Sequence, residues 1–160
     1  MAMDQLLRLL KTNALESPKN LAKMLNTTEA DVQARIEEYE RKGIIRGYQA
    51  IVNEDQLDLS LVRAAIEVKI TPEREGGFDR VAARVSRFPE VKSLFLMSGA
   101  YDLLVFVTGD SLQQVAAFVR KLATLEGVLS TSTHFMLQTY KDQGVLMEVE
   151  TKHERLQVSP

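Results

Sequence analysis

Two groups of side chains in this sequence have types and spacing suited to binding, and the first lies in residues 28–42. The amide of Gln33 is able to make two hydrogen bonds to adenine, and the methyl of Ala34 is able to contact the methyl of thymine. Cations along the same segment would neutralise phosphates. The acidic residues among them favour an alternative, a helical scaffold or dimerisation unit without affinity for DNA. The predicted DNA contacts are Thr28, Gln33, Ala34, Arg35, Arg41, Lys42 and Arg46.

The second group surrounds a turn and offers partners for both ends of a free amino acid. The Asp102 carboxylate suits an ammonium, and the backbone N–H groups of residues 99–101 suit a carboxylate. Thr131 and Thr133 alternate along one predicted strand, so their hydroxyls share a face. In a plainer interpretation, Gly99 serves only the geometry of the turn and Asp102 is a structural cap. The predicted effector site is Ser98, Gly99, Ala100, Tyr101, Asp102, Thr131 and Thr133.

The first group needs a pair of helices to position it, and local signals predict them. Ser17 followed by Pro18 is a favourable helix start. Thr28 is a second cap, and Asp31 three residues later would complete a capping-box-like pair. Gly43 ends the helix that carries the predicted contacts. The sequence therefore predicts helices over 3–12, from residue 18 and over 28–42, followed by a strand over 44–52 as a wing or linker.

Beyond residue 60 the apolar pattern changes from helical to alternating, which predicts a sheet domain. The order strand, helix, strand, strand, helix, strand is that of a ferredoxin-like βαββαβ domain, with an antiparallel four-stranded sheet and both helices on one face. The other face would carry Ala65, Leu103 or Leu104, and Val105 or Phe106, and should pair with another subunit. The predicted strands are 62–70, 91–97, 101–108 and 128–138, with an edge strand at 144–149, and the predicted helices begin at Phe78 and cover 111–124.

These elements define an α+β chain with two domains. The expected ranges are a winged helix-turn-helix over 1–52, a linker over 53–60, a ferredoxin-like domain over 61–149 and a polar tail over 150–160. Net charge is −2 for the 160 residues, with +1 in residues 1–52 and −3 in the remainder. The attraction to nucleic acid is therefore weak in bulk.

The chain resembles the Lrp/AsnC family of leucine-responsive and asparagine regulators over residues 3–141. The resemblance rests on NLAKMLNTTEADVQARIEEYERKGIIRGYQAIVN (20–53), on MSGAYDLLVFV (97–107) with Asp110, and on LEGVLSTSTHFMLQTYK (125–141). It implies dimers that associate further, commonly to octamers, and amino-acid effectors bound between subunits, where the second group of residues falls. The acidic recognition helix departs from the family pattern.

We therefore predict a cytoplasmic transcriptional regulator that binds double-stranded DNA as a homo-oligomer, a dimer or an octamer, and responds to an amino acid. With no cysteine and only His134 and His153, no spacing suits a metal, and neither a cofactor nor a membrane span is expected. One rival is an oligomeric sensor that has lost DNA binding. The other is an enzyme like the sirohaem decarboxylases, which share this architecture but would need clusters of His and Arg.

Overall fold

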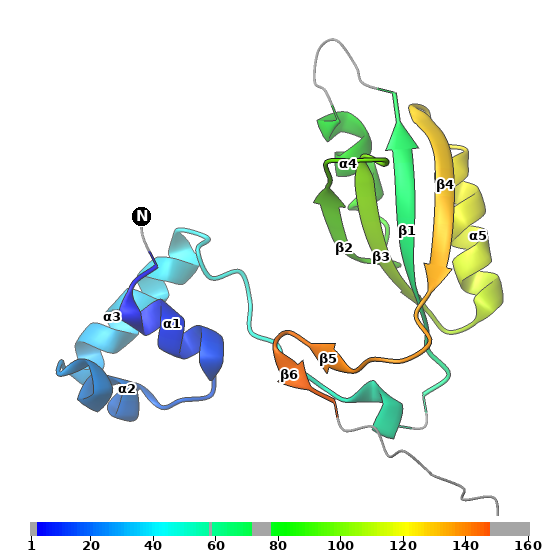
Figure 1. Ribbon diagram of the computed structural model, residues 1–160. Coiled ribbons are helices and arrows are strands. Elements are labelled where there is room, and N and C mark those ends of the chain that lie inside the picture. Colours follow the sequence, from blue (N-terminus) through cyan, green and yellow to red (C-terminus); the bar gives the residue numbers. More distant parts are fainter. Residues whose placement is uncertain (1–2, 58, 72–77, 148–160) are drawn as a thin grey trace, which may run out of the picture. The chain divides into compact units, whose positions relative to one another are not determined.

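The computed structural model describes residues 3–57, 59–71 and 78–147, which form two compact units, with the division along the chain between Ala50 and Ile51. Each unit is described by itself. The first is helical, with α1 (Gln5–Thr12), α2 (Pro18–Leu25) and α3 (Glu29–Arg41) (Figure 1). The three helices correspond to those predicted from the sequence. Their common core consists of Leu6, Leu10, Leu21, Ala22, Val32 and Tyr39.

Local capping explains where these helices begin. The Ser17 hydroxyl accepts a hydrogen bond from the Asn20 N–H at 3.2 Å, and Pro18 occupies the first turn of α2. The Thr28 hydroxyl accepts from the Asp31 N–H at 3.1 Å. Both predicted caps are confirmed. In a capping box the Asp31 carboxylate would accept from the backbone N–H of Thr28. Here it accepts instead from the hydroxyl of Thr27 at 3.0 Å.

Two residues with positive φ shape the turns on either side of α3. Asn26 (φ +53°) ends α2 in the left-handed region, which an asparagine tolerates. Gly43 (φ +67°) ends α3 as predicted, and the Ile44 N–H donates to the Tyr39 carbonyl at 2.8 Å. A Cβ at position 43 would lie 3.2 Å from Cζ of the exposed Arg46, which could move aside, so it is the backbone conformation that favours a glycine there.

The strand predicted over 44–52 is wrong. These residues are irregular, and a one-turn 3-10 helix, η1 (Glu54–Gln56), follows them. β-branched side chains favour extended backbone, but a strand also needs a hydrogen-bonded neighbour, and the other regular elements of this unit are all helices. The described part of the helical unit therefore contains no wing.

The second unit confirms the predicted fold class. Its sheet has the order β2-β3-β1-β4 with antiparallel neighbours, and both helices cover one face (Figure 1). This is the ferredoxin-like arrangement. The elements are β1 (Val62–Ile70), α4 (Asp79–Val85), β2 (Val91–Leu96), β3 (Leu103–Gly109), α5 (Leu112–Ala123) and β4 (Val128–Phe135).

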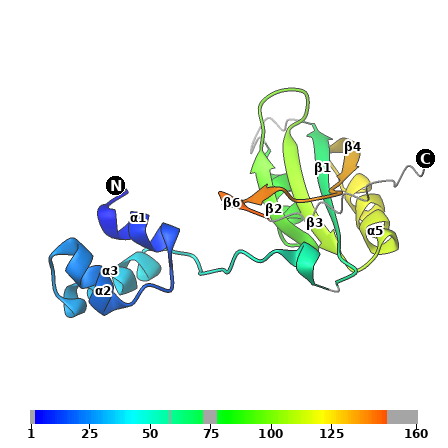
Figure 2. The same ribbon diagram turned by 60° about the horizontal axis from the view of Figure 1, so that its bottom comes forward.

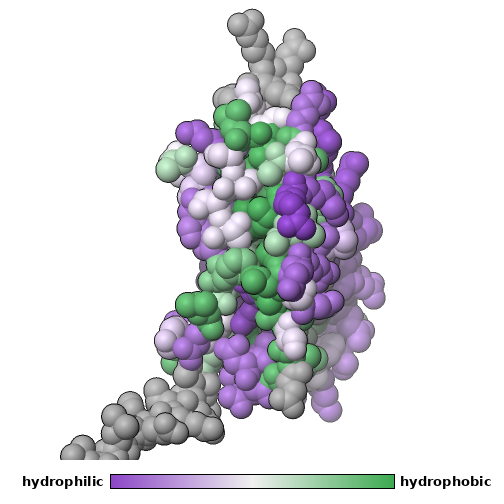
Figure 3. All heavy atoms as spheres, turned by 90° about the vertical axis from the view of Figure 1, so that its right-hand side faces the viewer, coloured by the Kyte–Doolittle hydropathy of each residue, from purple (hydrophilic) through white to green (hydrophobic). Residues whose placement is uncertain are grey.

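Alternation along the strands separates a covered face of the sheet from an open one. On β1 the buried residues are Ala64, Ile66, Val68 and Ile70, which pack under the helices as the pattern predicts. Leu103 and Val105 are buried with them, so Leu104 and Phe106 are the β3 residues that the open face carries. Figure 3 looks onto the α5 and β4 side, where an apolar band runs lengthwise between hydrophilic surfaces.

The segment after β4 departs from its prediction. β4 ends at Phe135, and β5 (Lys141–Asp142) pairs with β6 (Val145–Leu146) in a separate hairpin at the end of the sheet where β4 finishes (Figures 1 and 2). Residues 144–147 therefore add no edge strand to the main sheet. Gln143 and Gly144 have positive φ and form the tight turn of this hairpin, so β6 pairs with β5 and not with the main sheet. Residues 72–77, residues 148–149 and the predicted tail 150–160 lie outside the described residues.

Candidate functional site

The outer face of α3 presents the side chains predicted to read base edges. Val32 and Tyr39 are buried, and Ile36 packs against them, so the opposite side of the helix faces solvent. The exposed residues of the helix include four acids beside the polar and cationic residues, so the potential is mixed. The exposed positions are Glu29, Ala30, Asp31, Gln33, Ala34, Glu37, Glu40 and Arg41.

Arg35 has a different environment from the other predicted phosphate contacts. Its guanidinium lies 2.8 Å from Oδ2 of Asp4, before α1, and 3.6 Å from Oδ2 of Asp31. The Tyr39 hydroxyl donates to the same Asp4 oxygen. The hydrogen bond to Asp4, followed by that to Tyr39, raises the pKa of Arg35. This group therefore joins α1 to α3 and fixes how the helices pack.

The other predicted contacts lie at the two ends of α3. Thr28 uses its hydroxyl as the cap, and Lys42 pairs with Glu38 at 2.5 Å. The hydrogen bond from Lys42, together with its charge, lowers the pKa of Glu38. Arg41 is exposed at the last position of the helix, and Arg46 is exposed beyond its end. In this way the structure brings the predicted residues onto one helix and its C-terminal turn, apart from Arg35.

The Asp4 group makes the helical unit sensitive to acid. Burial alone would raise the pKa of Asp4, but hydrogen bonds from Leu7 N–H, Tyr39 and Arg35 outweigh it, so the pKa lies below its usual value. Because its folded-state pKa is lowered, the Asp4 carboxylate stabilises the helical unit at pH values above its unfolded-state pKa of about 4. This stabilisation is lost as the pH falls through the folded-state pKa. We expect urea unfolding of the helical unit, followed by NMR, to show this loss below about pH 5.

The Asp4→Asn variant supplies the control, because asparagine keeps the cap of α1 and removes the charge. At neutral pH it should be less stable by about 1 kcal/mol, a small value because the ion pair is partly exposed to solvent. Its stability should also vary less with pH over the acidic range. An acid dependence equal to that of the wild type would contradict this role of Asp4.

The predicted effector turn connects β2 to β3 and is tied to β1. The Asp102 N–H donates to the Val68 carbonyl at 3.0 Å, and Oδ2 of Asp102 accepts from the Ile70 N–H at 2.8 Å. Asp102 therefore has the structural role that was the plainer alternative, and its carboxylate retains Oδ1 for a ligand. Gly99 has φ +122°, with no atom within 4 Å of the position of a Cβ, so the turn is open to approach.

Thr131 and Thr133 lie on the other side of β1 from this turn. They are the register partners of Val68 and Ile66, whose side chains face the helices, so both threonines point to the covered face at the edge of the sheet. Two strand spacings of about 4.8 Å separate β4 from β3 across β1. Within one protomer the turn and the threonines therefore share one end of the sheet without meeting.

His134 lies on the open face, opposite Ala65, as its alternation with Thr133 predicts. Its Nε2 lies 3.3 Å from Oε1 of Glu67 and 3.4 Å from the Ser132 hydroxyl. Among the residues that the structure describes, no group of three His, Cys, Asp or Glu side chains is placed to hold a metal ion. Together with Glu67 and Ser132, His134 forms a polar region of the open face.

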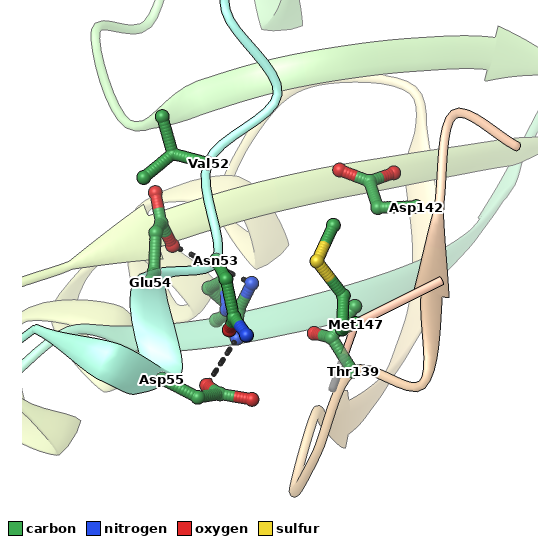
Figure 4. A pocket seen from close by; sticks show the side chains of 8 residues that line it. Val52, Asn53, Glu54, Asp55, Thr139, Asp142 and Met147 are labelled. Carbon is green, nitrogen blue, oxygen red and sulfur yellow. Dashed lines mark hydrogen bonds and ion pairs between the residues drawn. The ribbon is translucent and has the colours of Figure 1, made fainter. Parts of the chain in front are cut away.

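Sequence reasoning missed a small pocket at the start of the sheet domain (Figure 4). Arg63 of β1 forms ion pairs there with Glu54 at 3.4 Å and Asp55 at 3.2 Å. The pocket lies between the segment before β1 and the residues around the β5–β6 hairpin. These segments are far apart in the sequence, so no local pattern predicts that they come together. Its lining consists of Val52, Asn53, Glu54, Asp55, Arg63, Thr139, Asp142 and Met147.

A helical unit with an exposed third helix, followed by a ferredoxin-like sheet domain, is the architecture of a class of two-domain transcriptional regulators. The Lrp/AsnC ligand binding domain family matches residues 63–146. The chain is 41% identical over 158 residues to the uncharacterized HTH-type transcriptional regulator YugG of Bacillus subtilis. The matched region covers 98% of this chain and 95% of that protein. The chain belongs to the Lrp/AsnC family of helix-turn-helix transcriptional regulators.

Two further comparisons agree with this assignment. The uncharacterized HTH-type transcriptional regulator PH0140 of Pyrococcus horikoshii is 30% identical over 137 residues, 85% of this chain and 84% of that protein. The crystal structure of the transcriptional regulator NMB0573/L-Met complex from Neisseria meningitidis superposes with a TM-score of 0.68 and 25% identity, over 88% of this chain and 94% of that chain. Across the described residues, no helix is both long and apolar enough to cross a membrane.

Proposed function

We propose that this regulator binds double-stranded DNA through α3 of paired helical units. The exposed α3 face, which places Gln33 and Ala34 centrally and Arg41 at the end, is the observation that carries the proposal. A helix of this kind enters the major groove, where an amide is able to read adenine and a methyl to contact thymine. Arg41, Lys42 and Arg46 would contact the backbone beside it.

Assembly would be needed because one such unit has little positive charge. The open sheet face offers the surface: Phe95 is 51% exposed and packs edge-to-face on Phe106, with Leu104 opposite Phe95 in the register. An exposed apolar patch on a sheet face is typical of an interaction surface. A second copy of the same chain would cover it and link two helical units, which raises the apparent affinity without new contacts.

The ligand would be an amino acid bound near the turn at residues 98–102. A related regulator has been crystallised with L-Met, and here the open turn and Oδ1 of Asp102 offer donors and an acceptor of the required kinds. Thr131 and Thr133 would contribute from a neighbouring subunit, since they do not meet the turn within one chain. The ligand would change DNA affinity by binding one assembly better than another.

The DNA contacts are tested by fluorescence anisotropy with a duplex from upstream of the protein's own gene. Gln33→Ala should weaken binding by about 1–3 kcal/mol, and should do so for the specific duplex only. Arg41→Ala should weaken binding to every duplex and reduce the salt dependence by about one unit of slope. Arg84→Ala, which removes an exposed arginine from α4, is the matched control and should change neither quantity.

Absence of any complex for the wild-type protein at low salt and micromolar concentration would contradict DNA binding. It would favour the alternative of an oligomeric sensor without DNA affinity, which the exposed Glu29, Glu37 and Glu40 support. The ligand proposal is tested separately, by calorimetric titration of the protein with L-methionine and then with the other amino acids. Lack of heat with every one of them would contradict it.

A further inference from the structure

The sheet domain holds the segment that precedes it through one arginine. Arg63 is only 26% exposed, and its guanidinium bridges Glu54 and Asp55, which we call the Arg63 cluster (Figure 4). The backbone of Arg63 is fixed on both sides: it pairs with Thr108 of β3, and its carbonyl accepts from the Met136 N–H at 2.9 Å. The cluster is therefore anchored to a central strand of the sheet, near the start of that strand.

The segment held in this way has little stability of its own. η1 is a single turn, closed by hydrogen bonds from Gln56 N–H to Asn53 at 3.2 Å and from Leu57 N–H to Glu54 at 3.0 Å. A turn of this length does not persist alone in water. The ion pairs with Arg63 tie it to β1, and residues of the β5–β6 segment line the other side of the pocket.

The position of the cluster in the chain gives it a further meaning. The helical unit ends at Ala50 and β1 begins at Val62, so residues 51–61 connect the two, and the residues held by Arg63 lie in the middle of this connection. At its other end, β1 is bonded to Asp102 through Ile70. The seven-residue step from Arg63 to Ile70 spans about 23 Å of one strand. One strand therefore joins the candidate effector turn to the end of the connection.

We propose that Arg63 is a positioning residue for DNA recognition, which rests on the function proposed above. By holding residues 54–56 on the sheet, it shortens the free part of the connection to each helical unit. Two units of an assembly then reach half-sites of one separation better than others, because a shorter connection raises the effective concentration only where it spans the sites. Without the cluster, the free connection would be longer, and the paired units would bind half-sites of many separations with similar affinity.

Hydrogen exchange on the full-length protein tests the hold itself. In Arg63→Gln, the amides of Gln56 and Leu57 should exchange about tenfold faster, since a charged partner of η1 is lost. The double variant Glu54→Gln with Asp55→Asn changes only exposed or half-buried residues before β1 and should give the same result. Arg84→Ala, on α4, should leave these amides unchanged. Unchanged exchange in both cluster variants would overturn the proposal.

DNA binding tests the positioning role. Two copies of the segment that the wild type protects upstream of its own gene are separated by inserts that step through one turn, about 10 base pairs. We expect wild-type affinity to vary about tenfold between the best and worst inserts, and that of both cluster variants to vary within about twofold. Affinity for a duplex with a single copy should not change.

A charge-reversed triple variant, Arg63→Glu with Glu54→Arg and Asp55→Arg, should recover the preference for one separation. Faster exchange with an unaltered preference would overturn the positioning role, as would a loss of single-copy affinity equal to the loss on two copies. If the wild type binds no duplex, the function proposed above fails and the positioning role with it, while the exchange measurement still decides whether Arg63 holds η1.

Discussion

Leu104→Arg should convert the assembled protein to a monomer. Leu104 is central on the open face, opposite Phe95 on one side and Glu67 on the other. In an isolated chain the new guanidinium reaches water and Glu67, so the domain should fold. Beneath a second subunit the same charge loses its water, which costs several kcal/mol per ion. We expect assembly to weaken by at least about 100-fold, measured by sedimentation velocity.

The same substitution should weaken binding to two-site DNA by about 100-fold, because a monomer no longer offers linked units. Leu112→Arg is the matched control: Leu112 is an exposed leucine at the start of α5, on the side of the domain away from the open face. It should remain assembled and bind DNA normally. If Leu104→Arg also stays assembled, then a different surface joins the subunits.

Phe118→Ala should destabilise the sheet domain by about 3–5 kcal/mol and leave the helical unit folded. Phe118 is fully buried and packs edge-to-face on Phe88 with ring centroids 5.6 Å apart, so its removal leaves a cavity under the sheet. The helical unit has a separate core, which this ring does not enter.

Urea unfolding followed by NMR resolves the two units and checks this expectation at a fixed protein concentration, since assembly contributes to stability. Leu112→Ala, in the same helix but exposed, should change the free energy of unfolding by no more than about 0.5 kcal/mol. Simultaneous loss of both units in Phe118→Ala would show that they unfold cooperatively, against the division at residue 50.

Patterns confined to one element were predictable from the sequence. The alternation of Ala64, Ile66 and Val68 fixed the covered face of β1, because a strand places every second side chain on one side. Ser17 and Thr28 were predictable as caps, because a cap bonds to the backbone three residues later. The resemblance to the Lrp/AsnC family rested on residues 20–53, 97–107 and 125–141 and on their order and spacing.

Contacts made at a distance were not predictable. Arg35 was predicted to contact phosphate, and only the fold brings it to Asp4, 31 residues earlier. Asp102 bonds to Ile70 across the sheet, and Arg63 meets Glu54 only because η1 turns back toward β1. The expected strand over 44–52 failed for a related reason, since strand formation depends on a neighbour that the local sequence does not specify.

The most direct test of the account is the mass of the purified wild-type protein in solution, measured by native mass spectrometry and sedimentation equilibrium over a range of concentrations. A chain of 18.0 kDa that covers its open sheet face with a second copy should appear as dimers or multiples of dimers. A single species of 18.0 kDa at the highest concentration would contradict it, because paired helical units would then have nothing to join them.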